Sequence, residues 1–178
     1  MTMTPRLRKF ALTAHVTTTV GWLGAVVVFL ALAVVGLTSH DAQTVRGDYL
    51  VMEPVAWFVL VPMAIASLLT GIVQSLGTPW GLFRHYWVLF KLLITVFATI
   101  VLLIYMETFS LMAGVAADPS ADLDVVRNAS PGLHAALALL LLLVATVLAV
   151  YKPRGMTAYG RRKQKDQRTV SPAADAAT

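Results

Sequence analysis

Four long stretches of the chain are almost free of charge, and this feature limits the fold more than any other. They are Phe10–Leu37, Pro54–Leu76, Tyr86–Met106 and Gly132–Tyr151, and Lys91 carries the only formal charge inside them. Each stretch can cross the roughly 30 Å hydrocarbon core of a bilayer as a helix. Lipid cannot satisfy open backbone groups, and the alternating pattern of a membrane barrel does not occur. The sequence therefore predicts an all-α polytopic membrane protein, an up-down bundle of four transmembrane helices.

The composition supports this class and excludes several others. Of the 178 residues, 58% are hydrophobic and only 13% are charged, whereas soluble domains are about 25% charged. This excludes a soluble domain, a disordered chain and a collagen-like chain. There is no cysteine, which excludes disulfides, iron–sulfur clusters and cysteine nucleophiles. No dinucleotide fingerprint, phosphate loop or zinc-protease motif is present.

Basic residues predict the orientation and the domain limits. They flank the spans mainly on one side, with Arg6, Arg8 and Lys9 before the first span, Arg84 in the second loop, and Lys152, Arg154, Arg161, Arg162, Lys163, Lys165 and Arg168 after the last. The opposite side has only Arg46 and Arg127. The positive-inside rule then places both termini in the cytoplasm of a bacterial cell, with the protein in its plasma membrane. We expect a basic segment at 1–9, the membrane domain at 10–151, and a disordered basic tail at 152–178.

The expected partners follow from the same features. The four spans contact the lipid bilayer, and the basic tail contacts anionic lipid headgroups. A nucleic-acid role is not expected. Small side chains form a stripe on the first span, at Ala14, Thr18, Gly21 and Ala25. Such a stripe lets helices approach closely. It can serve contacts within the chain, a homo-oligomer or another membrane protein.

Three polar residues are the candidate site. Helical periodicity places His15, Gln74 and Lys91 on packing faces of the first three spans, at similar depth in the cytoplasmic leaflet. A lysine inside a span costs about 2.5–3.5 kcal/mol on insertion scales, so something must offset that cost. Lys91 either faces a cavity and holds an anionic group, such as a propionate, or extends to the membrane interface.

The histidines leave several roles open. His15 is a candidate haem ligand, metal ligand or proton carrier, or a neutral imidazole bonded to a neighbouring helix. His85 points away from Lys91 and is expected at the interface, and His134 is expected at the outer end of the fourth span. No set of residues predicts a metal site, so none is assigned.

Several stretches resemble known families. Residues 14–24, AHVTTTVGWLG, followed by residues 77–91, GTPWGLFRHYWVLFK, resemble a family of small bacterial integral membrane proteins of unknown function. This resemblance covers all four spans and continues to Met156. A histidine seven residues before Trp22, and Trp87 four residues before Lys91, are also similar to HemJ-type protoporphyrinogen oxidases, although the aromatic-Pro-Arg stretch of that family is missing. A lysine early in a span is similar to the copper-resistance D membrane domain.

These similarities imply different functions, which the sequence does not separate. The first resemblance implies no activity. The second implies that His15 and Lys91 contact haem or a porphyrin. We therefore expect a plasma-membrane protein with a polar site in the inner leaflet, with haem b as the candidate cofactor of a haem- or metal-binding accessory protein. The alternatives are a HemJ-like porphyrin oxidoreductase and a small transporter or channel subunit, and whether the protein is an enzyme stays open.

Overall fold

The chain folds into a long helical bundle, described here from a computed structural model that covers residues 3–175. The elements in chain order are α1 (Pro5–Thr38), α2 (Ala42–Val55), the π-helical turn η1 (Ala56–Leu60), α3 (Val61–Leu76), α4 (Tyr86–Ala117), the 3-10 turn η2 (Leu123–Val125), α5 (Ser130–Tyr151) and α6 (Ala158–Asp175). No strand occurs among these residues, which confirms the all-α class.

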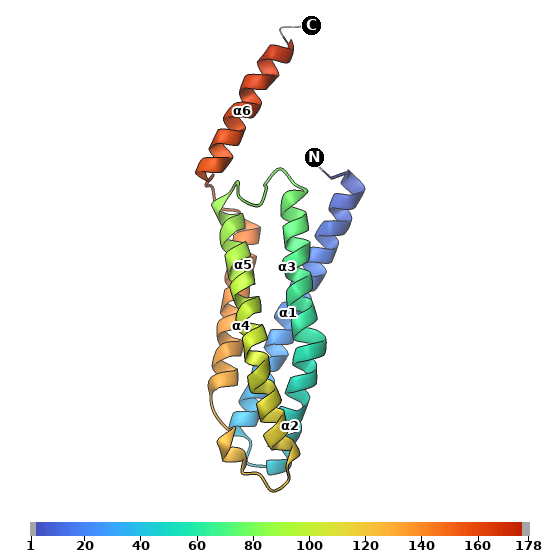
Figure 1. The fold of residues 1–178 in the computed structure, drawn as a ribbon, viewed down its shortest axis with the longest axis vertical. Helices are drawn as coiled ribbons and strands as arrows, with labels where there is room; N and C mark the ends of the chain where they lie inside the picture. The colour runs from blue at the N-terminus through green and yellow to red at the C-terminus, as the bar shows by residue number, and fades with distance from the viewer. Residues whose placement is uncertain (1–2, 176–178) are drawn as a thin grey trace.

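The helices form an antiparallel ring, as Figure 1 shows. α1 packs against α3 and α5, and α4 packs against the same two helices. α1 and α4 therefore lie on one diagonal of the bundle. Both ends of the chain lie at the same end of the bundle (Figure 1), which we call the termini end, and the opposite end is the distal end. The termini end holds the start of α1, the end of α3, the start of α4 and the end of α5.

Four helical segments are long and apolar enough to cross a membrane. They are Pro5–Thr38, Ala42–Leu76, Tyr86–Ala117 and Leu123–Tyr151. Large apolar side chains cover their outer surfaces, including Phe10, Phe58 and Ile104, which are each at least 70% exposed. A surface that is apolar over most of its area is unfavourable in water and favourable in lipid. The structure thus supports a multi-pass membrane protein.

The distal end contains more helix than the sequence predicted. The expected loop after the first span is mostly the helix α2, because the Asp41 side chain accepts hydrogen bonds from the backbone N–H groups of Gln43 and Thr44 and starts the helix. α4 also runs beyond the predicted end at Met106, as far as Ala117. Asp48 consequently lies on a buried helical face rather than in a loop.

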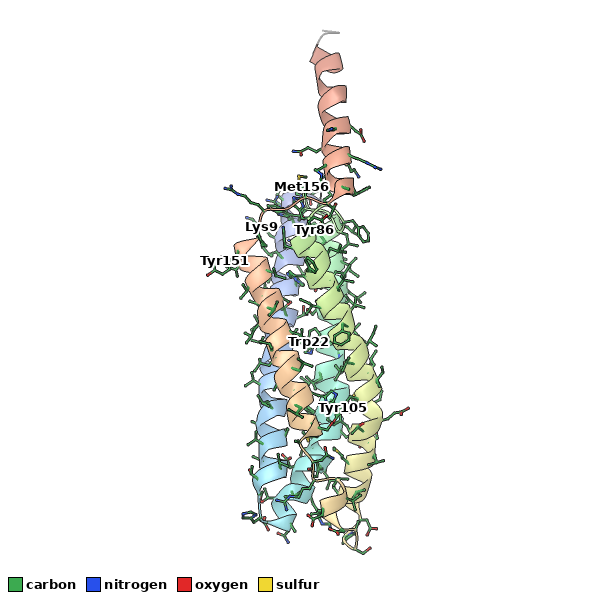
Figure 2. All side chains as sticks on the ribbon, turned by 90° about the vertical axis from the view of Figure 1, so that its left-hand side faces the viewer. Lys9, Trp22, Tyr86, Tyr105, Tyr151 and Met156 are labelled. Atoms are coloured by element: carbon green, nitrogen blue, oxygen red, sulfur yellow. The ribbon has the colours of Figure 1, made fainter. Side chains whose placement is uncertain are left out.

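The tightly packed core lies toward the distal end. It includes Trp22, Phe29, Tyr49, Met52 and Phe109, all at most 5% exposed. The Phe29 and Phe109 rings meet edge to face, with their centroids 5.1 Å apart. Trp22 lies about midway along the bundle in Figure 2, and Tyr105 lies further toward the distal end. Close packing therefore does not continue with the same density to the termini end.

The start of the basic tail is ordered, which differs from the disorder predicted for residues 152–178. α6 begins at Ala158 and projects away from the bundle (Figure 1). Thr157 fixes its start, because the Thr157 N–H donates to the Arg84 carbonyl over 3.0 Å and its hydroxyl donates to the Phe83 carbonyl over 2.6 Å. Gly160 packs so close to Arg84 that a Cβ would meet the Arg84 carbonyl oxygen at 2.4 Å. These contacts, which sequence periodicity does not reveal, hold the start of α6 against the loop that leads into α4.

Candidate functional site

A cavity of about 780 Å³ opens inside the bundle at the termini end. Its walls come from α1, α3, α4 and α5 and from the loop between α3 and α4. His15, Gln74 and Lys91 all line it, although they are far apart in sequence. The three residues predicted at one depth therefore share one cavity.

Hydrogen bonds fix His15 against α3. Its Nδ1 lies 3.2 Å from the Thr70 hydroxyl, and that hydroxyl donates its only proton to the Ala66 carbonyl over 2.6 Å. Thr70 can then only accept from the ring, so Nδ1 carries the proton of a neutral His15 and Nε2 keeps its lone pair. The Ser67 backbone carbonyl also lies within hydrogen-bonding reach of the ring, which agrees with a proton on the side that faces α3.

Gly71 allows this position of the imidazole. A Cβ on Gly71 would lie 3.0 Å from Cε1 of His15, so a larger residue would push the ring toward the centre of the cavity. Hydroxyl groups continue the polar wall beside the ring, because Thr19 and Ser67 lie 3.0 Å apart across α1 and α3. The small-residue stripe predicted on the first span thus packs against α3, where the hydroxyls of Thr18 and Thr70 lie 3.3 Å apart.

Positive charge dominates the cavity wall. Arg8, Lys9, Lys91 and Lys152 line the cavity, whereas none of its described lining residues is Asp or Glu. Within the part of the chain that the structure describes, none of these four cations forms an ion pair or hydrogen bonds with its charged group. Lys91 and Lys152 lie close enough for their like charges to repel. The cavity is therefore a region of uncompensated positive potential.

Sequence reasoning did not place Arg8, Lys9 and Lys152 in the site. They were assigned to the flanking segments that set topology, and positive-inside counting does not show whether a cation faces inward. A usable signal was present, because each of the three lies within two residues of a predicted span boundary. Figure 2 shows Lys9 at the same end of the bundle as Tyr86 and Tyr151.

Gln74 contributes an unmatched polar atom. Its Oε1 is shielded from solvent and has no hydrogen-bond partner. A buried acceptor without a partner is unfavourable by about 1–3 kcal/mol. Among the described residues, the amide oxygen of Gln74 is thus a polar atom that the fold leaves unsatisfied behind the cavity wall.

Tryptophan rings form the rim of the cavity beside the α3–α4 loop. Trp80 and Trp87 are in ring contact, with centroids 5.6 Å apart. The ammonium of Lys152 lies 5.5 Å from the centroid of Trp80, which is within the range of a cation–π interaction. Trp87 is 9% exposed, so it belongs to the wall of the cavity, whereas Trp80 and the loop frame its opening.

The other histidines lie outside this cavity. Nδ1 of His85 lies 2.8 Å from the Trp80 carbonyl at the rim. His134 packs on the Tyr105 ring at 4.4 Å and borders a separate, apolar cavity of about 80 Å³. His40 is exposed near the distal end. None of the three joins His15, and no group of three His, Cys, Asp or Glu side chains among the described residues is arranged to hold a metal.

Comparison with known proteins identified no relative of this chain. No protein-family model matches the chain, and no match was found among curated proteins or solved structures.

Proposed function

We propose that this protein binds an amphiphilic anion within the membrane, in the cavity at its termini end. The observation that carries the proposal is the set of four cations without a carboxylate partner that line one cavity, Lys91 half-buried within it and Arg8, Lys9 and Lys152 exposed at its opening. Apolar side chains such as Leu12, Leu23 and Leu92 complete the walls. A ligand with a negative headgroup and an apolar body matches both parts of this surface.

Energetics favour an anion over an empty site. Lys91 is partly withdrawn from water, and this is unfavourable for an ammonium unless an opposite charge or a dipole compensates it. Lys91 has no such partner in the described chain, and repulsion from Lys152 adds to the cost. An anion between them removes both penalties, and it interacts strongly because the surrounding dielectric is low.

The orientation of the site is part of this proposal. The positive-inside rule favours the termini end on the cytoplasmic side of the plasma membrane, which puts the cavity in the inner leaflet. There it is accessible to anionic lipids and to anions from the cytoplasm.

Native mass spectrometry of the full chain in mild detergent tests the proposal. We expect the wild type to retain an anionic amphiphile. In Lys91→Gln its occupancy should fall about tenfold, which corresponds to a loss of about 1.4 kcal/mol of binding free energy. Arg154→Gln is the matched control, because it removes a cation next to the site that does not line the cavity. No retained anion, or equal occupancy in the Lys91 and Arg154 variants, would contradict the proposal.

A porphyrin is a second candidate ligand, and His15 is the observation that favours it. The hydrogen bond from Nδ1 to Thr70 leaves Nε2 free to act as an axial ligand. Metal-binding histidines commonly donate a hydrogen bond from the ring nitrogen that does not bind the metal. The cavity cations suit two propionates. Residues for one axial ligand and for the carboxylates are thus present, and the haem iron would supply redox chemistry when bound.

The absorption spectrum tests this second candidate. A Soret band in the purified protein that is lost in His15→Ala and kept in His40→Ala would support haem at the cavity. If the haem-supplied protein is colourless, the porphyrin candidate is wrong, and so is a HemJ-like activity that depends on it. Growth rescue of a strain that lacks protoporphyrinogen oxidase, abolished by Lys91→Gln, would support the oxidoreductase.

A further inference from the structure

The number and position of the cations indicate how many negative charges the ligand carries, and not only that it is an anion. We propose that the cavity selects a lipid whose headgroup carries at least two negative charges, a phosphomonoester or a diphosphate, over a lipid with a single phosphodiester charge. This inference rests on the proposed function, since it names the class of amphiphilic anion.

The first argument is the pairing of Lys91 and Lys152. They come from the start of α4 and the end of α5, and their charges interact directly. A single negative charge compensates one ammonium and leaves the other unpaired. Two charges on one headgroup compensate both, and Arg8 and Lys9 on α1 add further positive potential at the same opening.

The second argument is that the end of α5 fixes the position of Lys152. Lys152 is the C-cap residue of α5 and the only non-glycine residue with positive φ among the described residues, at 44°. A left-handed residue commonly ends a helix. Its N–H donates to the Leu148 carbonyl over 3.1 Å, and its ammonium lies 5.5 Å from the centroid of the Trp80 ring. The helix end therefore holds this cation at the rim of the cavity.

Lipid titration of the full chain in nonionic detergent at pH 8 tests the inference. The probes are phosphatidic acid and phosphatidylglycerol with identical acyl chains, and the signal is the fluorescence of Trp80 and Trp87 at the cavity. At this pH a phosphomonoester carries nearly two charges, because its second ionisation lies near pH 6. We expect phosphatidic acid to bind about tenfold more tightly, since each added charge contributes on the order of 1.4 kcal/mol.

Three arms make the result specific. Lys152→Gln should remove most of the preference, whereas Arg154→Gln should keep it. At pH 5 the preference should shrink, because phosphatidic acid loses most of its second charge. Inorganic phosphate and diphosphate should displace phosphatidic acid only weakly, because they lack the apolar body.

The outcomes separate this inference from the proposed function. Equal binding of both lipids would overturn the selectivity and leave the binding of amphiphilic anions standing. Tighter binding of inorganic diphosphate than of phosphatidic acid would overturn the assignment to a lipid. Binding of neither lipid would count against the proposed function itself.

Discussion

The two ends of the bundle solve opposite problems with the same four helices. At the distal end, aromatic and sulfur-containing side chains fill the interior, and polar groups are mostly paired. Arg46, for example, donates to several backbone carbonyls after α4, including that of Ala121 at 2.8 Å. At the termini end, the interior is a cavity of about 780 Å³ with unpaired cations. The distal end thus provides stability, and the termini end keeps space and charge for a ligand.

This difference explains why the chain tolerates an unfavourable site. Burial of apolar surface in the distal core offsets the cost of leaving Lys91 without a partner. Stability and binding then depend on different residues. Substitutions at each end should separate the two properties, and the following predictions are ordered from the largest expected effect to the smallest.

The largest effect is expected in the distal core. Phe29→Ala should lower the free energy of unfolding by about 3 kcal/mol, because it removes a buried ring and leaves a cavity. Phe10→Ala is the matched control on the same helix, since Phe10 is 71% exposed; its effect should stay below about 0.5 kcal/mol. Unfolding by a denaturing detergent, followed by circular dichroism, measures both. Similar losses for the two variants would show that the core is not concentrated distally.

A smaller change of opposite sign is expected at the termini end. Lys91→Leu should raise the free energy of unfolding by about 1 kcal/mol in ligand-free protein, because an apolar side chain replaces an unpaired cation. The same variant should lose binding of the anionic amphiphile, and Lys91→Arg should retain it. Destabilisation by Lys91→Leu in the absence of ligand would mean that the lysine has a structural partner, which would contradict the comparison.

The smallest effect concerns pH at the distal loop. Hydrogen bonds from the Ser120 hydroxyl and then from its backbone N–H lower the pKa of Asp118 from its ordinary value of 3.8. The folded state therefore favours the charged carboxylate. Its contribution is complete above the ordinary pKa and is lost as the pH falls through the lowered one. Amide exchange in residues 118–122 should accelerate below about pH 4, and Ser120→Ala should weaken this dependence.

Part of this account was accessible from the sequence. Charge-free stretches are a local property, so the four crossings and the common depth of His15, Gln74 and Lys91 follow from counting along helices. The helix at 42–55 was not predicted, because Asp41 caps a segment of ordinary amphipathic composition, and the third span was ended at Met106 although α4 continues to Ala117. The contribution of Lys152 depends on a backbone turn and on a contact with Trp80 from a distant loop. Such features arise only after the chain has packed.

Some predictions stay predictions. The contact of the basic tail with anionic lipids, the cytoplasmic orientation and any homo-oligomer are independent of the bundle geometry. So are the resemblances to HemJ-type oxidases and to the copper-resistance D domain.

Cysteine accessibility tests the central claim, a water-accessible cationic cavity at one end only, most directly. The chain contains no cysteine, so a single new thiol reports on one position. Thr95→Cys lines the cavity, and Ala113→Cys lies on the same helix in the distal core at 5% exposure. In ligand-free protein we predict that an anionic thiol reagent labels Thr95→Cys faster than a cationic reagent of similar size, and that neither labels Ala113→Cys. Equal protection of both positions, or faster labelling of Thr95→Cys by the cationic reagent, would contradict the account.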